Sequence, residues 1–300
     1  MAGNVWEWVD GGEEGMKHLR GGSWQYLGEL YSVAWFRMPA DPKLTKDEVG
    51  FRYAKDERKN YLTAPLSVKD LKTVVSIPGG AYQVGISLPQ IGSLIRKHKI
   101  SSVEAQALDR QRSRSVRINS FQLRKYLVTN EEYYQFLQRT NHPRWPEHWL
   151  RQLLKWSDQP FLEKYRYHPV THVNYEDAAA FCSWCGGRLP TNEEWESAAR
   201  GEGSSLFSWG NDLEPERCNV SESGLARTNR VDENKSGVSP AGCFDLTGNV
   251  LEWVAGDSRN HYFVRGGSFT HKGVPYGLPA YCMPADPEAQ APDLGFRCVV

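Results

Sequence analysis

Two carboxylates flank a glycine turn near the carboxyl end of this 300-residue sequence. Asp245 and Glu252 lie seven positions apart, with Gly248 between them. Calcium binds about six to eight oxygens from carboxylates and backbone carbonyls, so these two carboxylates around a turn are candidate ligands of a hard cation. The alternative is that Glu252 hydrogen-bonds buried backbone groups in a tight turn. We favour a structural calcium ion.

The six cysteines form no pattern that is specific for zinc or for redox chemistry. Cys182 and Cys185 make a single CxxC, whereas zinc sites need a second pair of ligands. A redox CxxC opens a helix, and this one falls where a helix is expected to end. Because six cysteines are too dilute for a disulfide scaffold, we expect a cytoplasmic protein. Cys218, Cys243 and Cys282 are expected to be free thiols.

The histidines do not predict a metal centre by themselves. His168 and His172 are four positions apart, but Pro169 opposes a helix that would present both on one face. His142 and His148 have no acidic cluster near them in the sequence.

Charge and hydropathy exclude two classes of partner. The 36 Lys and Arg residues balance the 36 Asp and Glu residues, so the formal net charge is zero. There is no global basic field for a nucleic acid or a membrane surface, and no run approaches the roughly 18–20 apolar residues that span a bilayer. The first residues have neither the basic nor the apolar region of a signal peptide.

The chain contains an internal repeat with a constant shift of 245 residues, as from Gly3 to Gly248. The Gly-Asn-Val-x-Glu-Trp, Arg-Gly-Gly-Ser, Met-Pro-Ala-Asp-Pro and Gly-Phe-Arg segments all recur at this shift without a gap. A period of this length is about one domain. We therefore expect tandem domains: residues 1–55 are the end of a preceding copy, 56–70 a charged linker, and 71–300 a complete copy. The alternative is that residues 1–55 fold onto the main domain as an extra layer.

Capping signals predict three helices in the complete copy. Thr129 and Thr191 each begin a capping box, and Asn174 is a favoured N-cap residue. Their helices are expected to end near His142, Gly201 and Gly186, respectively. The last 100 residues are dense in Gly, Pro, Asn and Asp, which predicts loops. The basic stretch Ile95–Arg117 is interpreted as a solvated surface insertion, with a partner-binding patch as the alternative.

A set of short motifs resembles the formylglycine-generating enzyme family, also called the sulfatase-modifying factor family. The resemblance covers essentially all of 71–300, and its last motifs also cover 1–55. It implies an irregular, loop-rich α+β fold related to C-type lectins, with low secondary-structure content. The motifs are Ser76–Gly80, Val128–Glu131, Pro169–Val173, Gly187–Thr191, Glu194–Glu196, Gly248–Trp253, Arg265–Ser268 and Gly295–Cys298.

The resemblance also implies where a catalytic copper site would lie. Catalytic members bind Cu(I) through two cysteines five positions apart, just after the Arg-Gly-Gly-Ser segment. Here His271 and Tyr276 take those places, although Ser268 of that segment is retained. Imidazole and phenol are poor replacements for two thiolates, and Leu251 stands where the family has an active-site tryptophan. We expect no formylglycine-generating activity, and neither bound copper nor bound iron.

The remaining site residues follow from the same resemblance. The family's calcium loop maps onto the Asp245 and Glu252 side chains and the Gly248 and Val250 carbonyls. A second calcium site would begin near Asn219 and Val220, but the loop that follows is shorter here. The first copy starts just past the counterpart of Asp245 and cannot complete such a loop alone. Cys182 and Cys298 occupy the places of a family disulfide.

Two functions remain open from the sequence. The first is a calcium-stabilised module that binds a protein or small-molecule ligand through loops between Gly266 and Gly295, where the copies differ most. Its candidate ligand surface comprises Phe269, His271, Tyr276 and Tyr281. The second is a metal-dependent oxidase, of the formylglycine-generating or nonheme iron type, with altered ligands such as His271 with Tyr276 or Cys282. We favour binding.

Overall fold

The structure is a computed structural model that describes residues 6–9, 17–20, 38–40, 49–50, 74–140, 142–146, 148–149, 164–257 and 259–300. The chain divides into two compact units, which are Met1–Pro65 with Leu153–Ser157, and Leu66–Gln152 with Asp158–Val300. We describe each unit by itself. The predicted linker, residues 56–70, lies outside the described residues.

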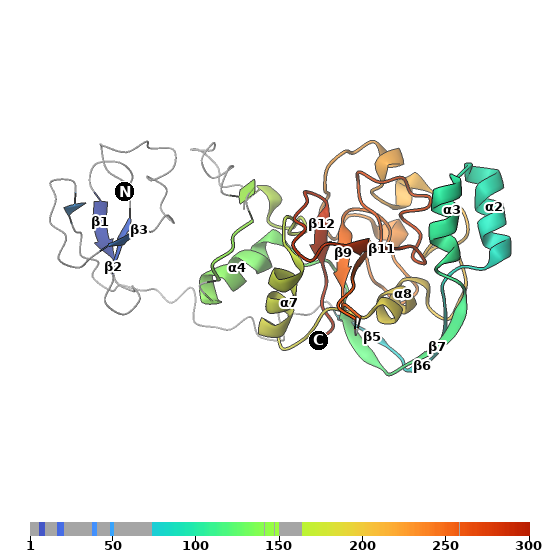
Figure 1. Ribbon diagram of the computed structural model, residues 1–300, viewed down its shortest axis with the longest axis horizontal. Helices are drawn as coiled ribbons and strands as arrows, with labels where there is room; N and C mark the ends of the chain where they lie inside the picture. The colour runs from blue at the N-terminus through green and yellow to red at the C-terminus, as the bar shows by residue number, and fades with distance from the viewer. Residues whose placement is uncertain are drawn as a thin grey trace. The chain divides into compact units, whose positions relative to one another are not determined.

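The first unit contains a four-stranded sheet in the order β3-β2-β1-β4 (Figure 1). Its strands are β1 (Trp6–Val9), β2 (Lys17–Arg20), β3 (Met38–Ala40) and β4 (Val49–Gly50). Strand β1 is antiparallel to β2 and parallel to β4, and β2 is antiparallel to β3.

The second unit contains a sheet with the same topology, in the order β11-β10-β9-β12. Its strands are β9 (Leu251–Val254), β10 (Tyr262–Arg265), β11 (Cys282–Ala285) and β12 (Leu294–Phe296). Glu7 pairs with Arg20 in the first sheet, and Glu252 pairs with Arg265 in the second. The backbone register therefore repeats with the same 245-residue shift as the sequence.

The second unit also contains, among the described residues, two antiparallel two-stranded sheets and five α-helices. Strand β5 (Val74–Ile77) pairs with β8 (Phe121–Arg124), and β6 (Gly80–Val84) pairs with β7 (Arg114–Ile118). The helices of the described residues are α2 (Leu88–His98), α3 (Ser102–Asp109), α4 (Asn130–Thr140), α7 (Tyr175–Trp184) and α8 (Asn192–Arg200). None of them is long and apolar enough to cross a membrane.

The three helices predicted from caps are confirmed as α4, α7 and α8. The Thr191 hydroxyl accepts a hydrogen bond from the Glu194 backbone N–H at the start of α8. The Asn174 side chain accepts one from the Asp177 N–H at the start of α7. Between these helices and the last short strands lie turns and the 3₁₀ segments Pro215–Arg217, Ser221–Ser223 and Lys235–Gly237, so the loop-rich α+β prediction is also confirmed.

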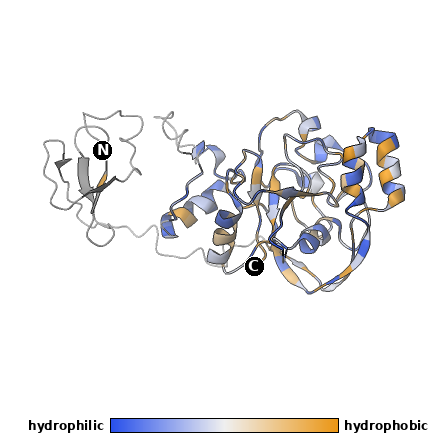
Figure 2. Ribbon diagram, viewed as in Figure 1, coloured by the Kyte–Doolittle hydropathy of each residue, from blue (hydrophilic) through white to orange (hydrophobic). Residues whose placement is uncertain are grey.

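The basic stretch Ile95–Arg117 is more ordered than the sequence predicted. It contributes the end of α2, all of α3 and most of β7. Its Lys and Arg side chains are exposed, as a solvated insertion requires. However, the hairpin of α2 and α3 buries Ile91, Leu94 and Leu108 against Leu278 and Tyr281. Its outer side keeps Leu88, Ile95 and Val103 exposed, and Figure 2 shows both hydrophobic and hydrophilic residues along these helices.

The largest core cluster is aromatic and lies between α4, α7 and the second sheet. It includes Tyr133, Phe136, Phe181, Trp253 and Phe296. Tyr133 stacks on Phe181 with 5.8 Å between ring centroids, and Phe181 meets Phe296 edge-on. Few large rings thus fill a core that has little regular secondary structure around it.

Candidate functional site

The loop after β10 places Ser268 in the interior. Gly266 and Gly267 both have positive φ, which residues with a side chain rarely adopt. A Cβ at Gly267 would lie 3.0 Å from backbone atoms of Tyr276 and Gly277, so this turn needs glycine. The turn brings Ser268, which is fully buried, beneath the loop that carries His271 and Tyr276.

Ser268 connects His271 to an aspartate that sequence analysis did not find. Its hydroxyl donates to Oδ2 of Asp293 at 2.6 Å and lies 2.7 Å from Nδ1 of His271. Since the single hydroxyl hydrogen goes to Asp293, Nδ1 of His271 is the donor to Ser268, which leaves Nε2 as an acceptor. Asp293 immediately precedes the Leu-Gly-Phe-Arg segment, but nothing in the sequence joins it to Ser268.

The candidate ligand residues lie together only in part. The rings of His271 and Tyr276 are 5.2 Å apart, and those of Tyr276 and Tyr281 are 5.4 Å apart. Phe269 is half-buried and belongs to neither ring pair, while Tyr281 is buried. The Tyr276 hydroxyl interacts with Glu104 of α3, and burial together with this carboxylate raises the pKa of the phenol.

No pair of thiols converges on this loop in the described part of the chain. The free cysteines there are Cys185, Cys218, Cys243 and Cys282. Burial raises the pKa of all four, to about 11 for Cys185 and Cys243 and to about 12 for Cys218. A thiol that resists ionisation is a poor ligand for a soft metal. The same residues contain no cluster of three or more His, Cys, Asp or Glu that could hold a metal ion.

The predicted calcium loop has an unusual backbone and a buried carboxylate. Asp245, Gly248 and Asn249 all have positive φ. A Cβ at Gly248 would meet the Asn219 carbonyl oxygen at 2.3 Å. The Asp245 carboxylate accepts from the side-chain amides of Asn234 at 2.7 Å and Asn249 at 3.1 Å. Burial is the main reason that the pKa of Asp245 rises to about 7.

Glu252 has a cation partner already. Both its oxygens bind the Arg297 guanidinium, at 2.6 and 2.7 Å, and both side chains are fully buried. Each carboxylate oxygen has two acceptor positions, so this ion pair leaves room for a shared ligand.

The donor set fits calcium through other atoms. The carbonyls of Gly248 and Val250 are buried, and they accept no hydrogen bond from the described residues. Unpaired buried carbonyls are uncommon in proteins. Together with Asp245 they are oxygen ligands of the kind that calcium prefers.

At the weaker predicted site, Asn219 is used for internal contacts. Its side-chain amide donates to the Arg227 carbonyl at 2.8 Å and to Oδ1 of Asn229 at 3.0 Å. Its backbone carbonyl accepts from the Asn249 N–H at 2.7 Å. Val220 is buried beside it. Asn219 thus ties the loop of η2 (Ser221–Ser223) to the predicted calcium loop.

A disulfide joins Cys182 of α7 to Cys298, with 5.6 Å between the Cα atoms. This is the pair that the family resemblance implies. The bond fixes the end of α7 to the segment that follows β12, 116 residues later. It lies within the aromatic core cluster and not beside Ser268.

The fold and the site together define a loop-rich α+β domain of the formylglycine-generating-enzyme class, which is C-type-lectin-like. The family model described as "Sulfatase-modifying factor enzyme 1-like domain" matches residues 1–57 and 60–300. The chain therefore belongs to this family.

Relatives of known description include active and inactive members. The chain is 35% identical over 152 residues to "Inactive C-alpha-formylglycine-generating enzyme 2" of Bos taurus, a match that covers 43% of this chain and 49% of that protein. The chain thus spans about half the length of that relative. It is 26% identical over 312 residues to "Formylglycine-generating enzyme" of Mus musculus, covering 82% of this chain and 80% of that protein.

Solved structures share the fold at low identity. "Treponema denticola variable protein 1" superposes with a TM-score of 0.57 at 19% identity, covering 75% of this chain and 94% of the other. "Structure of PvdO from Pseudomonas aeruginosa" gives a TM-score of 0.56 at 19% identity, with coverages of 75% and 93%. These likenesses concern the fold alone.

Proposed function

We propose that residues 71–300 form a sulfatase-modifying-factor-like domain without formylglycine-generating activity, which binds a ligand or protein partner through the loop between Gly266 and Gly295. One observation carries this proposal. The two places of the family's copper ligands hold His271 and Tyr276, and other residues already contact both: Ser268 lies against the imidazole, and Glu104 against the phenol. The likeness to a relative described as inactive supports the same conclusion.

The activity is tested with the purified chain, Cu(I) and a peptide that carries the sulfatase cysteine motif. We expect no loss of the peptide thiol by mass spectrometry. The control is the double variant His271→Cys with Tyr276→Cys, which restores two thiols at the required spacing, compared with each single variant. Turnover by the unchanged chain would refute the proposal, whether or not the double variant is active.

The second candidate is an oxidase with altered ligands, and one observation favours it. Asp293 and Ser268 hold His271 with Nε2 as an acceptor, and metal-binding histidines are commonly oriented through their other nitrogen in this way. Elemental analysis of the isolated chain separates the two functions. Stoichiometric copper or iron, lost in His271→Ala, supports the oxidase, whereas calcium alone supports binding.

Calcium is proposed as a structural ion in the loop Asp245–Glu252. Asp245 and the Gly248 and Val250 carbonyls would hold it, and Glu252 would share its carboxylate between the ion and Arg297. The ion supplies positive charge to a buried carboxylate and a ligand position to two unpaired carbonyls. It takes no part in chemistry.

The parent protein's setting is proposed from the internal repeat, the net charge and the cysteine content of the sequence. We propose tandem copies of this domain, and neither a nucleic acid nor a membrane as partner. The proposed cytoplasmic location is opposed by the Cys182–Cys298 disulfide, since such bonds persist mainly in oxidising compartments. Mass-spectrometric thiol counting on protein trapped in its native cells, with and without reduction, tests this location.

A further inference from the structure

A second site lies between β6, β7, α8 and the second sheet, and it is lined by neither His271 nor Tyr276. It is a cavity of about 130 Å³. A single water needs roughly 10–15 Å³ on the same measure, so the space exceeds that of one water several times. Its lining includes Arg265 of β10, Cys282 of β11 and Asn192 at the start of α8.

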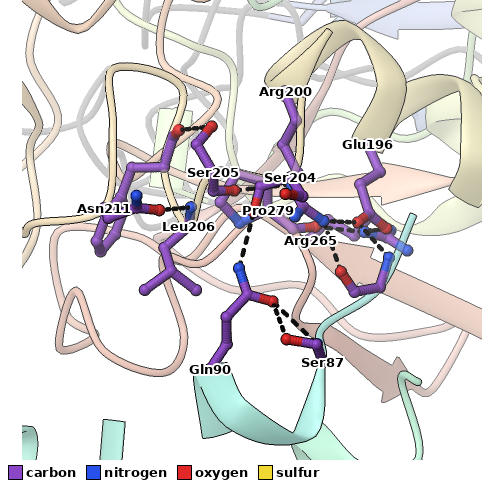
Figure 3. A network of polar contacts seen from close by, with 12 residues as sticks. Ser87, Gln90, Glu196, Arg200, Ser204, Ser205, Leu206, Asn211, Arg265 and Pro279 are labelled. Carbon is purple, nitrogen blue, oxygen red and sulfur yellow. Dashed lines mark hydrogen bonds and ion pairs between the residues drawn. The ribbon is translucent and has the colours of Figure 1, made fainter. Parts of the chain in front are cut away.

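The cavity lining itself balances two arginines, Arg114 and Arg265, against two glutamates, Glu193 and Glu196. The excess positive charge comes from Arg200, which lies outside the lining and binds Glu196. Glu196 accepts from Nη1 of Arg200 at 2.7 Å and from Nη1 of Arg265 at 3.2 Å. Figure 3 shows the side chains of both arginines converging on the Glu196 carboxylate. Their exposed fractions are 2% for Glu196, 3% for Arg200 and 4% for Arg265. Among the described residues, Glu196 is the only carboxylate that forms an ion pair with Arg200 or Arg265. Two buried cations therefore share one buried anion.

Backbone carbonyls offset only part of that excess. Arg200 donates to the carbonyls of Gly85 and Ser205, and Arg265 donates to that of Pro279 at 2.6 Å. These groups are dipoles and not full charges. An uncompensated charge in the interior is costly, so a second anion beside the arginines would be stabilising.

Arg265 is the group that presents this charge to the cavity. Its Nε donates to the Asn192 side chain at 2.8 Å, and its Nη1 donates to Glu196 and to the Pro279 carbonyl. Its Nη2 donates to no oxygen atom of the residues that the structure describes. The Cys282 thiol forms the adjacent wall, and it donates to the same Asn192 oxygen at 3.1 Å. The cavity therefore presents a planar cation, which suits an oxyanion, beside a thiol and an amide, while the two carboxylates of its lining are each paired with an arginine.

The mouth of the cavity is an exposed ion pair. Arg114 of β7 and Glu193 of α8 both line the cavity, and their charged atoms are 2.6 Å apart. We propose that this cavity binds a small oxyanion of the phosphate, sulfate or carboxylate type, with Arg265 as the buried contact and Arg114 at the entrance. This site goes beyond the proposed function and does not depend on it.

The first test uses thermal shift and calorimetry on the intact chain in chloride buffer at constant ionic strength. Phosphate, sulfate and acetate are added separately up to 10 mM. The anion that raises the melting temperature identifies the type of oxyanion that the cavity binds. Glu193→Gln frees Arg114 and is expected to tighten binding roughly two- to fivefold, the range for one exposed charge. Arg114→Gln is expected to weaken it by a similar factor. Arg166→Gln, which removes an exposed cation paired with Glu131, is the matched control and should have no effect.

The second test reports the charge in the cavity without any assumption about the natural anion. Cys282 is alkylated with iodoacetate, an anion, or with neutral iodoacetamide, and each site is quantified by peptide mass spectrometry. We expect iodoacetate to be favoured roughly tenfold at Cys282 relative to Cys185, which lies near both Arg124 and Glu132. The oxyanion that shifts the melting temperature should also slow alkylation at Cys282 alone. Absence of any oxyanion-dependent shift beyond that of chloride, or the same response in Arg114→Gln as in the unchanged chain, overturns the proposal.

Discussion

The two four-stranded sheets of this chain share their strand order and register, and for the second sheet the structure also describes the segments that pack on it. Both place a Glu-Trp strand between an antiparallel and a parallel neighbour. In the second sheet, Trp253 of this strand donates to the Val173 carbonyl, 80 residues earlier in the chain. Glu252 binds Arg297 from beyond β12. The strand pattern and the partners Glu252 and Arg297 are thus encoded within about 50 consecutive residues, whereas the partner of Trp253 comes from a remote segment.

The largest expected effect tests the buried ion pair of the second sheet. Arg297→Met leaves Glu252 buried without its cation, and we expect a loss of about 3–5 kcal/mol in the free energy of unfolding. Urea denaturation followed by tryptophan fluorescence measures it. The change Glu7→Gln, at the repeat position of Glu252, should reduce the free energy of unfolding by less, because Glu252 and Arg297 stay paired.

A control for this prediction is Glu131→Gln, which removes an ion pair with Arg166 that is exposed. Its expected cost is below about 1 kcal/mol. A loss of that small size for Arg297→Met would show that the second sheet does not depend on the buried pair of Glu252 and Arg297.

The disulfide is the next difference between the copies, since Tyr53 stands at the repeat position of Cys298. Cys298→Ser is expected to cost about 2–4 kcal/mol, because the bond closes a long loop of the unfolded chain. Melting temperatures with and without dithiothreitol measure it. The change Cys185→Ser should leave the sensitivity to dithiothreitol intact. If Cys298→Ser still responds to the reductant, the effect arises from another cysteine.

Calcium is expected to distinguish the two units, because no residue of this chain stands at the repeat position of its proposed ligand Asp245. At about 100 times its dissociation constant, the ion is expected to add roughly 2.7 kcal/mol to the stability of the complete copy. Chelation and back-titration, followed by scanning calorimetry, measure the gain. Asp245→Asn keeps the size of the side chain and should abolish it. An equal gain in that variant would place the ion elsewhere.

The smallest effect concerns the tryptophans at equivalent positions, Trp253 and Trp8. Trp253→Phe keeps an aromatic ring but leaves the Val173 carbonyl unpaired, at an expected cost of about 1–3 kcal/mol. Trp8→Phe should leave this transition unchanged, since the bond to Val173 remains. Urea denaturation of both variants compares them, and equal losses would show that the bond from Trp253 to Val173 does not stabilise the second sheet.

Much of the fold could be predicted because its signals are local. The caps at Thr191 and Asn174 predicted helix starts within a few residues, and the 245-residue repeat of the sequence reappears in the register of the two sheets. The hairpin of α2 and α3 was missed because its basic side chains conceal the apolar face formed by Ile91, Leu94 and Leu108. Asp293 was missed because its link to Ser268 spans 25 positions and leaves no pattern in the sequence.

The sequence by itself determined the family, the repeat and the loss of the paired thiols, because these depend only on residue types at fixed spacings. Only the tertiary structure decided that Glu252 faces Arg297, that Ser268 links His271 to Asp293, and that two arginines share one glutamate beside a cavity. The physical reason is that burial and charge balance are set by whichever side chains the folded backbone brings together, here from positions up to 69 residues apart.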